Sequence, residues 1–269
     1  MSTLDGTARL MEKPPAEPRN EREDYWTLAR QPLHSLLFLL PLLAFYEIGV
    51  GLLAGPAHET ARNGADYWMR TGLHLAGLRH PLLLPVVVIG LLTAWHVAGR
   101  FRWKASPAAL LGMLAESFLF GMCLVVLGQL QDLAFRSQLV PTARSTHAGV
   151  LLSNPTAVPA VISYIGAGIY EEVLFRLCLI PLVYGVLRAL LLPRRLAVLL
   201  AVMATSLLFS AAHYVGPAAD TFTIFSFVFR AMAGVFFAGL FVARGFGITA
   251  GSHAAYDLLV GILIPAFGV

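Results

Sequence analysis

Two adjacent carboxylates lie one helical turn before an arginine in the stretch Glu171-Glu172-x-x-x-Arg176. Residues four apart share a helix face, so Glu172 and Arg176 are predicted to form an ion pair that keeps Glu172 charged and fixed. Glu171 then points about 100° away and stays free. A free carboxylate in apolar surroundings is suited to act as a general base. The alternative is an ion pair that only holds two helices together.

Two histidines follow, each four residues from a possible partner. His213 comes four residues after Phe209, and His253 comes four residues before Asp257. A carboxylate one turn away can hold one imidazole nitrogen and orient the other, and we assign this role to Asp257. Taken alone, each histidine is also compatible with a purely structural role.

Together the clusters place carboxylates, histidines and an arginine on three apolar segments. Convergence on one polar site would satisfy all of them, whereas separate burial would be costly. A glutamate and a histidine can activate water for hydrolysis. Glu171, His213 and His253 are also suitable zinc ligands. The chain has no His-Glu-x-x-His motif, so a zinc site would have to be assembled across helices, and we favour a metal-free site over zinc.

The composition requires that lipid surrounds most of the chain. The 269 residues are 58% hydrophobic and 13% charged, whereas soluble domains have roughly 45–50% apolar and about 25% charged residues. We predict an all-α polytopic transmembrane bundle of seven spans, or eight if the long fourth segment is divided near Pro181 and Gly185. The predicted spans are Leu33–Ala54, Leu82–Ala98, Ala108–Phe135, Pro159–Leu192, Leu196–His213, Phe222–Ala243 and Ile248–Phe267.

Residues outside the spans predict the organisation and orientation of the chain. Residues 1–32 are charged and rich in proline, which is typical of a disordered cytosolic tail, and residues 33–269 are predicted to form one membrane-embedded domain. Basic residues in alternate loops place the N-terminus in the cytosol. The excess of arginine over lysine favours a bacterial chain in the inner membrane. The net charge of +4 comes from short loop clusters, so nucleic acid is not an expected partner.

The motifs resemble those of the CPBP family of intramembrane proteases, which includes the type II CAAX prenyl endopeptidase and bacterial Abi-like membrane proteases. The family pattern is Glu-Glu-x-x-x-Arg, then Phe-x-x-x-His, then His-x-x-x-Asn or Asp. This chain carries all three in order on successive apolar segments over about residues 155–260, in the form Glu171-Glu172-x-x-x-Arg176, Phe209-x-x-x-His213 and His253-x-x-x-Asp257.

The resemblance implies an endopeptidase that cuts a membrane-anchored peptide or protein. It implies that Glu171 and His213 activate the attacking water and that His253 holds the scissile carbonyl oxygen. Glu172 and Arg176 would support the site. An ionised Asp257 cannot donate to an oxyanion, unlike the asparagine of the other family variant. Both glutamate-type and metal-dependent mechanisms are described for the family.

Two other interpretations come from different functional classes. Ionisable residues in spans also suit a proton- or ion-coupled transporter, with Glu171, Arg176 and Arg230 on the path. No internal repeat of the kind common in transporters is visible in the sequence. The chain could also be a catalytically silent membrane scaffold. Glu116 and Arg230, which lie in predicted spans, are expected to pair with each other or to line the substrate path.

Overall fold

The computed structural model describes residues 24–53, 62–138, 157–216 and 219–266, and within these ranges the chain is helical without strands. This confirms the predicted all-α class. The helices in chain order are α1 (Tyr25–Ala29), α2 (Pro32–Leu52), α4 (Gly64–Leu75), α5 (Leu83–Ala98), α6 (Pro107–Gln138), α7 (Ala157–Glu172), the π-helical η2 (Val173–Leu179), α8 (Ile180–Ala189), α9 (Arg194–Ala212), α10 (Ile224–Arg244), α11 (Phe246–Leu258), the π-helical η3 (Leu259–Leu263) and α12 (Ile264–Ala266).

Five helical stretches of the described chain are long and apolar enough to cross a membrane. They are Pro32–Leu52, Pro107–Phe135, Arg194–Ala212, Ile224–Arg244 and Phe246–Leu263, and the apolar helix Leu83–Ala98 is shorter. Large apolar side chains such as Leu111, Leu119 and Leu130 are exposed along α6, which is the expected surface for contact with lipid. The total of seven or eight membrane spans stays a prediction.

The predicted fourth span is one helical run whose geometry changes in the middle. α7 leads directly into η2, and η2 leads into α8. Pro181 lies in the first turn of α8, where it has no N–H to donate to the preceding turn. The wider π turn immediately before it accommodates this missing hydrogen bond without ending the helix.

The predicted cytosolic tail is described only in part. Its residues 1–23 lie outside the described ranges. In the last part of the predicted tail, Tyr25–Ala29 form the short helix α1. Trp26 and Tyr25 in this helix lie against the guanidinium of Arg244 at the end of α10, with 3.9 Å from its carbon to the Trp26 ring.

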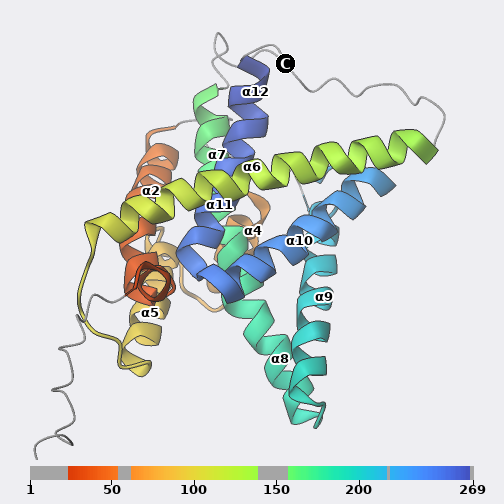
Figure 1. The fold of residues 1–269 in the computed structure, drawn as a ribbon. Helices are drawn as coiled ribbons and strands as arrows, with labels where there is room; N and C mark the ends of the chain where they lie inside the picture. Colours follow the sequence, from red (N-terminus) through yellow and green to blue (C-terminus); the bar gives the residue numbers. More distant parts are fainter. Residues whose placement is uncertain (1–23, 54–61, 139–156, 217–218, 267–269) are drawn as a thin grey trace, which may run out of the picture.

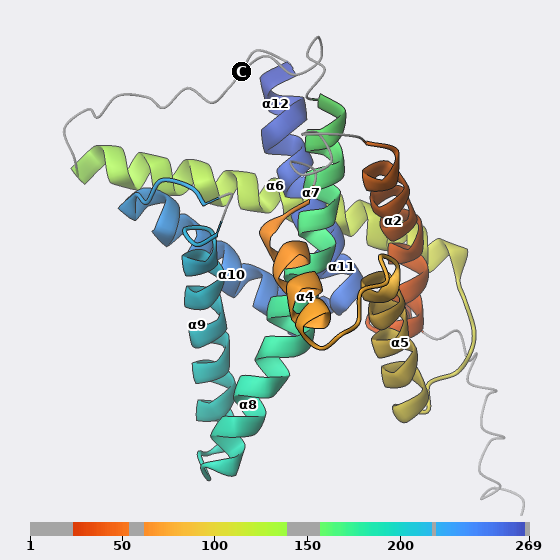
Figure 2. The same ribbon diagram turned by 180° about the vertical axis from the view of Figure 1, so that it is seen from behind.

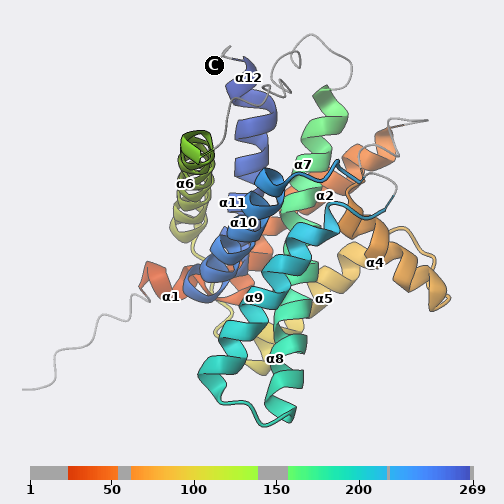
Figure 3. The same cartoon turned by 90° about the vertical axis from the view of Figure 1, so that its right-hand side faces the viewer.

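α11 occupies the centre of the bundle and packs against α2, α6, α7 and α10. Figure 1 shows α6 running across the direction of α7 and α12, and Figures 1 and 3 show α8 and α9 as an antiparallel pair. α7 approaches α11 closely at Gly168, where a Cβ would lie 2.6 Å from the backbone nitrogen of Ala254. Small residues permit such close helix packing in membranes.

A sharp reversal between α10 and α11 brings the last motif to the centre. Gly245 has a φ of 88°, a conformation that glycine adopts without steric cost. The chain therefore leaves α10 and starts α11 at the next residue. The backbone N–H of Gly247, in the first turn of α11, donates to the Ser35 hydroxyl of α2 at 3.0 Å, which satisfies one of the amide groups that a helix start leaves unpaired.

Candidate active site

Glu172 links two of the three motifs. Its Oε2 lies 3.0 Å from Arg176 Nε, so the predicted ion pair is confirmed. Its Oε1 lies 2.7 Å from Nδ1 of His253 on α11. Glu172 is 0% and Arg176 2% exposed. This carboxylate therefore balances a buried cation and holds an imidazole ring at the same time.

Aromatic rings surround the guanidinium of Arg176. Its central carbon lies 4.5 Å from the centre of the Phe209 ring on α9 and 5.4 Å from that of Phe237 on α10. Its Nη2 donates to the carbonyl oxygen of Gly234 at 3.2 Å. Aromatic faces attract a desolvated cation, so Arg176 connects the helix of the glutamates to α9 and α10.

Glu171 faces both histidines. Its Oε2 lies 3.8 Å from Nε2 of His213 and 3.9 Å from Nε2 of His253. The side chains of Glu171 and His213 are 13% and 25% exposed, so the group is partly open. The predicted convergence of the three motifs is confirmed. Both O···N distances are somewhat longer than that of a hydrogen bond. Distances of this kind often shorten when substrate binds.

The ring of His213 has a defined tautomer when it is neutral. Its Nδ1 lies 2.8 Å from the carbonyl oxygen of Phe209. A carbonyl oxygen only accepts, so Nδ1 carries the proton and the lone pair of Nε2 points to the side of Glu171. Phe209 thus contacts His213 twice, through its carbonyl oxygen and through its ring, which lies edge-on to the His213 ring at 5.0 Å.

His253 has contacts in addition to the predicted one with Asp257. Glu172 holds Nδ1, and the Phe237 ring stacks on the imidazole at 4.6 Å. Asp257 Oδ2 lies 3.5 Å from Nε2, the nitrogen that faces Glu171. The helical spacing of Asp257 could not reveal the contact from Glu172, because that contact depends on how α7 packs on α11.

Glu116 and Arg230 do not pair with each other. Glu116 accepts two hydrogen bonds from Arg244, at 2.8 Å and 2.7 Å. Arg230 pairs with Asp220 and lies over the Tyr214 ring. Of the two alternatives for Glu116 and Arg230, the structure therefore contradicts a mutual pair, and both residues form other ion pairs. Arg244, which the sequence placed in a loop, is the residue that ties the end of α10 to α6.

Sequence reasoning missed the helix α4 inside the predicted 55–81 loop. A local signal was present, because Asn63 is an N-cap whose side chain accepts from the backbone N–H of Asp66 at 2.8 Å. Arg62 and Arg70 lie one turn before and after Asp66 and pair with it. Asp66, together with Glu47 at Arg70, thus balances the charges of these two arginines.

The predicted zinc ligands Glu171, His213 and His253 converge, and Glu171 Oε2 lies less than 4 Å from Nε2 of each histidine. Among the residues that the structure describes, no group of three or more histidine, cysteine, aspartate or glutamate side chains was found that could hold a metal ion.

Fold and site together define a helical membrane protein with a buried carboxylate–histidine centre on α7, α9 and α11. Residues 153–259 match the model of the family described as type II CAAX prenyl endopeptidase Rce1-like. All three motifs lie inside this match, which confirms the resemblance seen in the sequence and indicates a protease. No curated protein and no solved structure matches the chain significantly.

Proposed function

We propose that the chain is an intramembrane endopeptidase that hydrolyses a peptide bond with a water activated by Glu171 and His213. The observation that supports this best is the position of Glu171 Oε2, which lies within 4 Å of Nε2 of both histidines. Two hydrogen-bond acceptors that face one point can hold a water by its two protons. The lone pairs of the water oxygen are then directed away from Glu171 and His213.

The reaction requires one proton acceptor and one oxyanion donor. Glu171 takes a proton from the water as the oxygen attacks the scissile carbonyl carbon, and a tetrahedral oxyanion forms. When His253 carries both protons, its Nε2 donates to this oxyanion. The C–N bond then breaks, and the proton held by Glu171 passes to the leaving amine. The products are a new carboxylic acid, which releases its proton to solvent, and a new amine, and Glu171 is again ionised.

The supporting residues fix these two groups. Glu172 holds the far nitrogen of His253, and Arg176 holds Glu172. We assign Asp257 to the environment of His253 Nε2, where its carboxylate adds negative charge opposite Glu171. Preorganised groups of this kind need no rearrangement when charge develops.

We propose a membrane-anchored peptide or protein as the substrate. The catalytic helices lie among apolar helices with lipid-facing side chains, so the scissile bond must reach the site at the membrane. The matching family is described as type II CAAX prenyl endopeptidase Rce1-like, which is consistent with a lipid-anchored substrate. A bacterial inner membrane with the N-terminus in the cytosol is the proposed location.

Cleavage of reporter peptides tests the proposed function. Purified protein in liposomes is incubated with a set of lipid-anchored and transmembrane reporter peptides in water enriched in ¹⁸O. We expect products in which one ¹⁸O enters the new carboxyl group, because water is the nucleophile. A transporter or a silent scaffold would leave every reporter intact, and products without ¹⁸O would contradict direct attack by water.

Removal of metal ions is expected to leave the activity unchanged. The proposed mechanism uses no metal ion, so a strong chelator should change the cleavage rate by less than about two-fold, whereas loss of a bound catalytic metal costs several kcal/mol of transition-state stabilisation. The measurement compares initial rates before chelation, after it and after addition of zinc. Loss on chelation with recovery on zinc would contradict the metal-free mechanism.

A further inference from the structure

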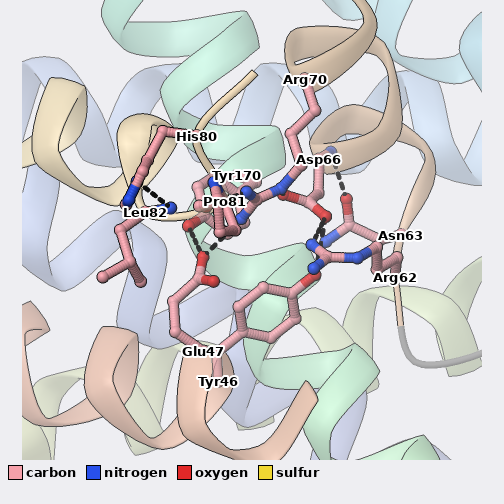
Figure 4. A network of polar contacts seen from close by, with 10 residues as sticks. All are labelled: Tyr46, Glu47, Arg62, Asn63, Asp66, Arg70, His80, Pro81, Leu82 and Tyr170. Carbon is pink, nitrogen blue, oxygen red and sulfur yellow. Dashed lines mark hydrogen bonds and ion pairs between the residues drawn. The ribbon is translucent and has the colours of Figure 1, made fainter. Parts of the chain in front are cut away.

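A second polar network lies on the opposite side of α7 from the histidines. Its side chains come from α2, α4 and α7, three elements that meet as shown in Figures 2 and 4. α7 contributes Tyr170, the residue directly before the two glutamates, and Tyr170 is 0% exposed. The proposed chemistry uses none of these residues.

Hydrogen bonds connect Tyr170 to α4 in a continuous series. The Tyr170 hydroxyl donates to Oε1 of Glu47 on α2. The same oxygen accepts from Nη2 of Arg70 at 2.7 Å. The Nε of Arg70 donates to Oδ1 of Asp66 at 2.7 Å. Figure 4 shows these groups pointing toward one another.

The far end of the series is firmly held. Asp66 is 0% exposed, and its Oδ2 accepts from Arg62 at 2.7 Å and from the Tyr46 hydroxyl at 3.1 Å. The Tyr46 ring lies edge-on to the Tyr170 ring at 5.3 Å. This contact connects the Asp66 end of the series back to Tyr170. Fully satisfied buried networks are rigid, so the network is a fixed point against which α7 can be set.

The end of α7 needs such a fixed point. The π-helical η2 begins at Val173, directly after Glu172. A π turn interrupts the regular hydrogen bonds of the α-helix, so α7 does not continue past Glu172 with unchanged geometry. Successive side chains on a helix diverge by about 100°. A contact that fixes the direction of Tyr170 therefore also fixes the directions of Glu171 and Glu172.

We propose that Tyr170, Glu47 and Arg70 are positioning residues that set the rotation of α7 so that Glu171 and Glu172 face the two histidines. The role rests on the proposed function, since it concerns how the same site is aligned. None of the three residues contacts His213 or His253 in the described structure, so they act only through the glutamates.

Replacement of Tyr170 by phenylalanine isolates this role. Tyr170→Phe keeps the ring and removes the hydroxyl that binds Glu47. We expect kcat for reporter cleavage to fall about ten-fold, because small misplacements of reacting groups cost up to about 10²-fold. We expect KM to stay within about two-fold, because the substrate-facing surface is unchanged.

Tyr46→Phe is the matched control. It removes a second buried tyrosine hydroxyl from the same network, but from α2 and not from the helix of the glutamates. The two variants should lose similar thermal stability, and only Tyr170→Phe should lose kcat. Equal kcat values in both would overturn the positioning role, as would a change confined to KM.

A second variant and a measurement without substrate complete the test. Glu47→Gln should also lower kcat at constant KM, and its combination with Tyr170→Phe should lower kcat no further, because both act in one series. If the two losses in kcat multiply in the combined variant, Glu47 and Tyr170 do not act in one series.

The ¹⁵N resonances of His213 and His253 test the alignment even if no reporter is cleaved. They should shift in Tyr170→Phe and in Glu171→Gln, and stay in place in Tyr46→Phe. Unchanged resonances in Tyr170→Phe would overturn the inference. Failure of the wild type to cleave, with the shifts observed, would count against the proposed function alone.

Discussion

Glu171→Gln is expected to abolish peptide cleavage and leave the fold intact. The amide keeps the size of the side chain and can still accept a hydrogen bond, but it cannot take a proton from water. General-base assistance is typically worth about 10²–10⁴ in rate, so kcat should fall by at least about 10². The thermal midpoint should change little, because no hydrogen-bond partner of Glu171 Oε2 occurs among the described residues. Single-turnover cleavage of a validated reporter measures the loss.

Glu116→Gln provides the contrasting control for that variant. Glu116 is also a carboxylate on a membrane helix, but it binds Arg244 in an ion pair outside the site. Its replacement should lower stability and leave kcat of the folded protein unchanged. If Glu171→Gln cleaves at a rate near that of the wild type, the general base has been assigned to the wrong residue.

Arg176→Ala is expected to lower both the folded yield and the activity. The substitution leaves the buried carboxylate of Glu172 without its cation, and breaking a buried pair in this way costs about 3–5 kcal/mol. Glu172 also orients His253, so the protein that still folds should cleave slowly. Detergent-resistant folded yield, thermal midpoint and kcat are the measurements.

Two further variants separate charge from bulk at this position. Arg188→Ala removes an exposed arginine from α8 in the same helical run and should leave both yield and kcat near the wild-type values. The double variant Glu172→Gln with Arg176→Met removes both charges, and it should recover stability but not activity. Full activity and yield in Arg176→Ala would show that the buried ion pair is dispensable.

Local helix geometry explains which parts of the site could be predicted. The pairing of Glu172 with Arg176 follows from a spacing of four residues on one helix, and so does the contact of His253 with Asp257. The Glu172–His253 bond joins residues 81 apart in the sequence, and it depends on the close packing of α7 on α11 at Gly168. Spacing alone therefore could not reveal the partner of His253 Nδ1.

The same distinction holds for the fold. Runs of apolar residues predicted the membrane helices, because lipid imposes a minimum length. They could not predict the direction of α6, which crosses its neighbours, since helix crossing is set by packing. The predicted span ends at Ala243, so the sequence places Arg244 in a loop. In the structure, the packing of α10 on α6 brings Arg244 to Glu116. The helix α4 was missed because it is too short and too polar to resemble a span.

The central position of α11 also has a consequence for how the protein enters the membrane. The stretch Phe246–Leu263 is the least apolar of the five long helices, and 61% of it is buried inside the protein against 22–33% for the others. Insertion of a segment from the translocon into lipid depends on its apolarity, and an aspartate near its centre costs about 2.5–3.5 kcal/mol. The helices that enclose α11 all precede it in the chain. We therefore expect its insertion to wait for those helices, so that His253 enters a protein environment and not bare lipid.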